Sequence, residues 1–146
     1  MKKQEMEAFE LTSRKTKGGG PQRVEVEASL VGPFAIHRNI VRVEKGVARQ
    51  GQVWVVTTAD GEGLLNTDFR KADDAVAFAK ALDKETHDFD RYGYAGALED
   101  ADAAESNEPV VDFMLAQLDA CADIGWKRVK SFYKRAYWER EGKKAA

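Results

Sequence analysis

Few residues in this sequence have the types and spacing that catalysis or metal binding requires. The densest group is residues 86–90, where His87 is followed by the carboxylates of Asp88 and Asp90, and these side chains could bind a divalent cation or transfer protons. A metal site needs three or more convergent ligands, and His37, the only other histidine, falls in a predicted strand without a partner at ligand spacing. We interpret residues 86–90 as a solvated helix end and His37 as a strand residue satisfied by a neighbour. An enzyme with a site near His37, His87 and Asp90 is the alternative.

Two other features could be taken for reactive sites. Residues 60–63, with the sequence DGEG, lack the Lys and Ser/Thr of a phosphate loop and lead into a strand, which favours a hairpin turn. Cys121 is the single cysteine, so it can form neither an internal disulfide nor a zinc site of several thiolates, and it is expected to pack as a small hydrophobe. No Ser or Thr lies in a nucleophile-elbow context. We therefore predict a non-enzymatic protein without metal or cofactor.

The end of the chain, residues 126–141, combines basic and aromatic side chains. Lys and Arg neutralise phosphates and Trp or Tyr can stack on bases, so this pattern is compatible with a surface for nucleic acid or an acidic partner. Aromatic residues at helical spacing are also typical of a stripe that faces the core, and the sequence leaves both interpretations open. Two arginines of the second predicted strand complete the set of candidate binding residues. The candidates are Arg38, Arg42, Lys127, Arg128, Lys130, Lys134, Arg135 and Trp138.

Charge is strongly segregated along the chain although the net charge is only −2. Residues 83–125 contain two basic and twelve acidic side chains, whereas residues 126–146 contain eight basic and two acidic ones. Such segregation can guide a charged partner to the basic end. It can equally be neutralised within the molecule, if the acidic segment packs against the basic one.

Alternation of apolar and polar residues predicts an antiparallel four-stranded sheet over about 24–69. The predicted strands are residues 24–30, 34–43, 52–59 and 64–69. The clearest contains Trp54, and the break in alternation at residues 37–39 predicts a bulge. Residues 44–52 are expected to be a loop. The run Gly18-Gly19-Gly20-Pro21 predicts a flexible leader over residues 1–22, because ordering glycines costs backbone entropy.

Helical periodicity follows the sheet. Residues 71–85 place Ala and Leu at three- and four-residue spacing with Asp73 and Asp74 in the first turn, which predicts a helix that covers the sheet. We expect an acidic loop over residues 86–106 and helices over about 107–141, with Ser106 or Asn107 as a cap, Gly125 as a break, and a final helix over 126–141. Residues 23–146 are therefore predicted to form a single α+β domain.

The composition and the apolar runs of the sequence bear on the cellular compartment of the protein. A chain of 146 residues with 43% hydrophobic and 33% charged residues suits one well-solvated domain. Its apolar runs fall far short of the roughly 20 residues that a membrane span requires, and its first ten residues lack the apolar stretch of a secretion signal. We expect a cytoplasmic protein with no membrane association.

The order of residues within 24–84 resembles two groups of small nucleic-acid-binding domains. The features are Trp54-Val55-Val56, a turn with Gly61 and Gly63, then Phe69 and an Ala-rich helix over 75–82. The stretch is similar to the arm-binding domains of phage integrases, and to the four-strand-then-helix unit of the whirly and positive-cofactor families, which dimerise and bind single-stranded DNA. The resemblance implies a sheet-plus-helix fold, DNA or RNA as a partner, and a homo-oligomer.

These observations support two hypotheses of function. The first is a small bacterial or phage-type module that associates with nucleic acid, with the basic last twenty residues as the principal contact. The second is a protein interaction or assembly module that docks a partner, or a second copy, through an open sheet edge or the C-terminal helix.

Overall fold

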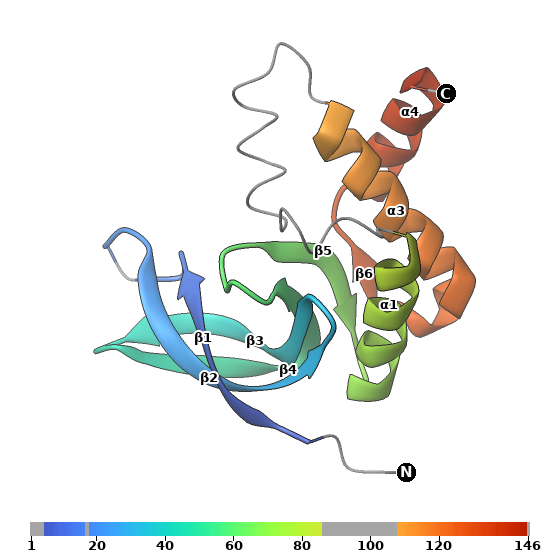
Figure 1. Cartoon of the computed structure of the whole chain (residues 1–146). Coiled ribbons are helices and arrows are strands. Elements are labelled where there is room, and N and C mark those ends of the chain that lie inside the picture. Colours follow the sequence, from blue (N-terminus) through green and yellow to red (C-terminus); the bar gives the residue numbers. More distant parts are fainter. Residues whose placement is uncertain (1–4, 17, 86–107, 146) are drawn as a thin grey trace.

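A computed structural model describes residues 5–16, 18–85 and 108–145 of the chain. Over these ranges the protein is α+β, with one six-stranded antiparallel sheet followed by helices (Figure 1). The strands are β1 (Glu7–Ser13), β2 (Gln22–Val31), β3 (Phe34–Glu44), β4 (Val47–Thr58), β5 (Leu64–Phe69) and β6 (Ser131–Phe132). The helices are α1 (Ala72–Glu85), α3 (Glu108–Ile124), the short 3-10 helix η1 (Trp126–Arg128) and α4 (Arg135–Ala145). The predicted fold class is confirmed, but the sheet has six strands and not four.

The strands form a simple meander in which each is antiparallel to the next, in the order β1-β2-β3-β4-β5-β6. The bulge expected near residues 37–39 is present, because the β3–β4 register shifts between Arg38 and Ile40 and again between Ile40 and Arg42. The prediction of a loop over residues 44–52 was wrong. Lys45 and Gly46 alone make the turn, with φ of 51° and 77°, and β4 begins at Val47.

Strand β1 corrects the prediction of a flexible leader over residues 1–22. Glu7–Ser13 pair with β2 along their whole length, from Glu7 opposite Ala28 to Ser13 opposite Gln22. Phe9 and Leu11 are buried and alternate with exposed Glu10 and partly exposed Thr12, which is the strand period of two. The glycine run that suggested flexibility lies after this strand, in its connection to β2.

One face of the sheet is covered by helices. The predicted helix over residues 71–85 is confirmed as α1, which packs with α3 against this face. Phe34, Phe69 and Phe78 are fully buried between the layers, and the small side chains of α1, such as Ala75 and Ala79, let the helix approach the strands closely. This is the larger of the two apolar clusters.

The opposite face is covered by the sheet itself. Strands β1 and β2 cross in front of β3 and β4 (Figure 1), and they bury a second cluster against them. The members of that cluster are Phe9, Leu11, Val24, Val26, Ala28, Ala35 and Val43. The strong curvature of the meander therefore makes a partly closed barrel out of β1 to β5.

The prediction of a single helix over residues 126–141 was wrong, because the segment contains η1, β6 and α4. Gly125, with φ of 102°, ends α3, and Lys134, with φ of 54°, separates β6 from α4. Between them the backbone bonds to the edge of β5: Lys130 N donates to Asp68 O at 2.9 Å and Tyr133 N to Asn66 O at 2.7 Å. Ladder hydrogen bonds to an unpaired sheet edge thus replace the helical bonds that the side-chain spacing suggested.

Among the helices described, none combines the length and the apolar character needed to cross a membrane.

Candidate functional site

The basic C-terminal surface, residues 126–145, contains all eight Lys and Arg residues of the chain's end, and each is exposed. Three of them have carboxylate partners: Arg128 with Asp74 at 2.7 Å, Arg135 with Glu139 at 2.8 Å, and Lys144 with Glu141 at 3.4 Å. The other five form no salt bridge to any residue that the structure describes. They are Lys127, Lys130, Lys134, Arg140 and Lys143.

The aromatic residues of this surface divide into two groups. Tyr133 is 65% exposed and Tyr137 40% exposed, whereas Val129 and Phe132 are buried. Trp126 and Trp138 are partly buried and pack against the helix-covered core. The interpretation as a core-facing stripe therefore fits the buried residues, and the two exposed tyrosines do not belong to such a stripe. Trp138, one of the candidate binding residues, is largely committed to packing.

Cations lie over several of the aromatic rings. The Lys134 ammonium is 5.4 Å from the centre of the Tyr133 ring, and the Arg135 guanidinium is 3.5 Å from that of Trp126. Arg135 also pairs with Glu139, so its charge is already engaged on both sides. Lys134 keeps its charge at the surface beside an exposed ring.

The two arginines predicted on the sheet lie elsewhere. Arg38 on β3 stacks over Trp54 at 5.0 Å, and Arg42 pairs with Glu44 at 2.8 Å. The β3–β4 turn, which follows Arg42 closely, lies on the opposite side of the molecule from α4 (Figure 1). Six of the eight candidate residues thus belong to one surface, and none of the described contacts joins Arg38 or Arg42 to them.

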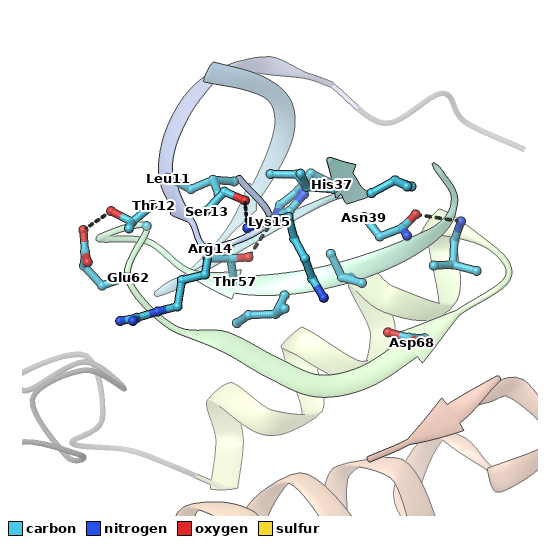
Figure 2. Close-up of a pocket in the computed structure, with 16 residues that line it drawn as sticks. Leu11, Thr12, Ser13, Arg14, Lys15, His37, Asn39, Thr57, Glu62 and Asp68 are labelled. Atoms are coloured by element: carbon cyan, nitrogen blue, oxygen red, sulfur yellow. Dashed lines mark hydrogen bonds between the residues drawn. The ribbon is translucent and has the colours of Figure 1, made fainter. Parts of the chain in front are cut away.

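A groove of about 650 Å³ opens where residues 11–15, here called the strap, cross the barrel face of β3, β4 and β5 (Figure 2). The strap is tied at two points. Thr12 N donates to Gly61 O at 2.8 Å, and Val43 N donates to Lys15 O at 2.9 Å. The apolar lining comes from Leu11, Ile40, Val41, Val53, Val55 and Leu64.

The acidic side chains around the groove have partners, whereas the basic ones have none among the described residues. Glu62 bonds both Arg23 and Thr12 at 2.7 Å, and Asp68 accepts a hydrogen bond from the Ser131 hydroxyl at 3.0 Å. Arg14 and Lys15 are exposed and have no carboxylate partner within the described part of the chain. Figure 2 shows the Lys15 side chain directed across the groove and the Arg14 side chain directed toward the margin on which Glu62 lies, with Asp68 on the other side.

His37 lines the groove but has no free nitrogen to offer there. The side chain is 2% exposed, with Nδ1 2.8 Å from Arg38 O and Nε2 2.7 Å from the Thr57 hydroxyl. Because a carbonyl oxygen only accepts, Nδ1 carries the proton and Nε2 accepts from Thr57. Burial lowers the pKa of His37, so the ring is neutral near pH 7. The prediction of a satisfied strand histidine is confirmed; His87 and Asp90 lie outside the described residues.

Cys121 is fully buried on α3, and burial raises the pKa of its thiol to about 12. A nucleophilic or metal-binding cysteine needs the thiolate, which is scarce here at neutral pH. The expectation that it packs as a small hydrophobe is confirmed. Among the described residues, no three His, Cys, Asp or Glu side chains are grouped so as to hold a metal ion.

Arg14 and Lys15 were missed by sequence reasoning because both fall in the predicted leader. The signal that could have located them is the short alternation of Phe9 and Leu11 with Glu10 and Thr12, which marks the strand immediately before them.

The fold and these surfaces define an α+β protein whose sheet is covered by helices on one face and by its own first hairpin on the other. Comparison with known proteins found no matching family model, no similar curated protein and no similar solved structure.

Proposed function

We propose that this chain is a non-enzymatic module that associates with nucleic acid through its basic C-terminal surface. The observation that carries the proposal is the set of five exposed cations without a salt-bridge partner in the described structure, in the same segment as the exposed rings of Tyr133 and Tyr137. Free Lys and Arg side chains release counterions from a phosphate backbone, and exposed tyrosines provide faces on which unpaired bases stack.

The arrangement of this surface favours a polyanion. Three of the free lysines, Lys127, Lys130 and Lys134, lie within eight residues on the short elements between α3 and α4, where the backbone is fixed by the edge of β5. Side chains held on a rigid edge lose less conformational entropy on binding than those on a mobile tail. The surface is therefore suited to a ligand with regularly repeated negative charges, because the edge of β5 holds the backbone that carries the lysines.

The first test measures binding of fluorescently labelled single- and double-stranded oligonucleotides between 50 and 200 mM salt. The variant K127A/K130A/K134A should bind more weakly, and the slope of log affinity against log salt should fall by roughly 2 to 3. A matched control, R49A/K80A/K84A, removes the same charge from exposed residues on β4 and α1. Equal weakening in both variants, or no binding by the wild type at 50 mM salt, would contradict the proposal.

A second test separates base stacking from charge. Tyr133→Ala should weaken binding of a single strand, by up to about 1–3 kcal/mol if one base stacks on the ring, and should change duplex binding much less. Tyr133→Phe retains the ring and should bind as the wild type does. Equal losses for single strand and duplex would show that the tyrosine does not stack on bases.

A further inference from the structure

The groove under the strap has the dimensions of a small-molecule site. Its volume of about 650 Å³ falls within the range of about 300–1,000 Å³ that is typical of ligand pockets. The hydrogen bonds Thr12–Gly61 and Val43–Lys15 hold the strap across the barrel face at two places, so the space beneath it is bounded along the strap. A bounded space of this size suits a discrete ligand better than a continuous polymer.

The lining indicates a ligand with an apolar body. Six of the groove's side chains are aliphatic, and none of its lining residues is Phe, Tyr or Trp. Leu64 is 56% exposed and Val41 59% exposed, so apolar surface at this site remains in contact with water. Covering such surface is favourable by roughly 25 cal/mol per Å². Aliphatic walls provide no faces for stacking nucleobases, which distinguishes this site from the basic C-terminal surface.

The rim indicates an acidic head group. Lys15 extends over the groove and Arg14 lies at its margin, both without a carboxylate partner among the described residues, whereas the nearby Glu62 is neutralised by Arg23. The Asn39 amide is oriented by its oxygen, which accepts the Val53 N–H at 3.3 Å, and this leaves its NH₂ group available as a donor. Two cations and an amide donor are suited to a carboxylate or a similar monoanion.

We infer that the groove binds a small organic monoanion with an aliphatic body, its acidic group lying at the rim where Lys15 and Arg14 supply positive charge. The aliphatic part lies along Val53, Val55 and Leu64, which come from β4 and β5. Asp68 lies at the opposite side of the groove and places a negative charge beyond the apolar lining. A second acidic group on the ligand would meet this carboxylate, so the site discriminates against dianions of the same length.

The test uses three eight-carbon probes: octanoate, octanedioate and octan-1-ol. Each is titrated into the full-length ¹⁵N-labelled protein, and binding is followed by backbone amide shifts in two-dimensional NMR. Octanoate should shift the amides of residues 11–15, 39, 53 and 64–68 in a saturable manner. Octanedioate and octanol should bind at least about tenfold more weakly, since the first meets Asp68 and the second lacks the charge.

Matched variants separate the rim from general charge. Arg14→Ala with Lys15→Ala should reduce octanoate affinity by about tenfold or more. The control changes another exposed pair, Arg70 and Lys71, to alanine and should leave affinity unchanged. Asp68→Asn should raise octanedioate affinity toward that of octanoate, and the dispersion of the amide spectrum shows whether each variant is folded.

Three outcomes would overturn the inference. The first is an absence of saturable shifts with octanoate at millimolar concentration. The second is octanoate shifts located at residues 126–145 and not around the groove. The third is equal affinity of the R14A/K15A variant and the wild type. None of these depends on nucleic-acid binding, so the site and the proposed function succeed or fail separately.

Discussion

The two faces of the sheet are covered in different ways. Helices α1 and α3 cover one face, and large side chains such as Phe34, Phe69 and Phe78 are completely buried there. The other face is covered only by β1 and β2, and its cluster contains a single aromatic residue, Phe9. A pair of helices spans a sheet broadly, whereas a hairpin covers a narrower band and leaves a groove at its margin. The difference shows why the open site lies on the strand-covered face.

The largest expected effect separates the two clusters. Phe69→Ala removes a ring that is fully buried under the helices and should lower the free energy of unfolding by about 3–5 kcal/mol. Phe9→Ala, at 8% exposure in the smaller cluster, should cost at least about 1 kcal/mol less. Urea denaturation of both variants measures the difference, and equal losses would show that the hairpin-covered cluster is as important as the helix-covered one.

A second prediction concerns the point where the strap meets the β4–β5 turn. Gly61 has φ of 78°, and a Cβ there would collide with Glu10 O and approach Leu11 Cα to 2.8 Å. Gly61→Ala should therefore cost about 2–3 kcal/mol in unfolding free energy and detach β1 from the turn. Gly18→Ala is the matched control, because Gly18 has φ of 65° but open space around it, and should cost about 1 kcal/mol or less. Similar costs would mean that backbone strain, and not the contact with β1, determines the effect.

The third prediction is a pH dependence that originates on the strand-covered face. The pKa of His37 in the folded protein lies below its ordinary value of 6.5, so the unfolded chain binds more protons than the folded one as pH falls past 6.5. The stability contributed by the neutral ring is complete above that pH and is lost as pH falls through the lowered pKa. Denaturation midpoints between pH 7.5 and 5 should fall for the wild type and less steeply for His37→Gln.

The other histidine serves as the control for this pH series. His87→Gln should retain the wild-type slope of stability against pH, since His37 is still present. If His87→Gln removes the slope and His37→Gln does not, the buried histidine is not its source.

A smaller effect is expected where the C-terminal segment meets α1. Arg128 pairs with Asp74 at 2.7 Å, but its side chain is 46% exposed, so solvent screens the interaction. Arg128→Ala should change unfolding free energy by less than about 1 kcal/mol. A double-mutant cycle with Asp74→Ala isolates the pair, and a coupling above about 2 kcal/mol would contradict this assignment of a surface salt bridge.

The smallest expected effect concerns the Cys121 thiol, which we expect to be unreactive in the native protein. Cys121 is fully buried with its thiol pKa raised to about 12, so the native protein should not react with a thiol reagent such as Ellman's reagent within hours. The same protein in denaturing urea should react completely within minutes. Fast reaction under native conditions would show that the helix-covered core opens readily near α3.

Much of the fold could be predicted because local patterns agree with it. The alternation around Trp54, the Asp-rich first turn of α1 and the turn at residues 60–63 all correspond to elements that the structure contains. The candidate site was predicted less completely. The cations at residues 126–145 were identified from composition, whereas Arg14 and Lys15 acquire their position only from contacts made far along the chain.

The amino-acid sequence by itself determined the strands β2 to β5, the helices α1 and α3, and the basic character of the chain's end, because periodicity and charge are local properties. The tertiary structure alone decided two matters. Residues 130–133 form hydrogen bonds to the free edge of β5 and are therefore not helical. The curvature of the meander places β1 across β3 and β4. Both depend on hydrogen bonds and packing between residues distant in sequence, such as Thr12 with Gly61, and no local pattern records such contacts.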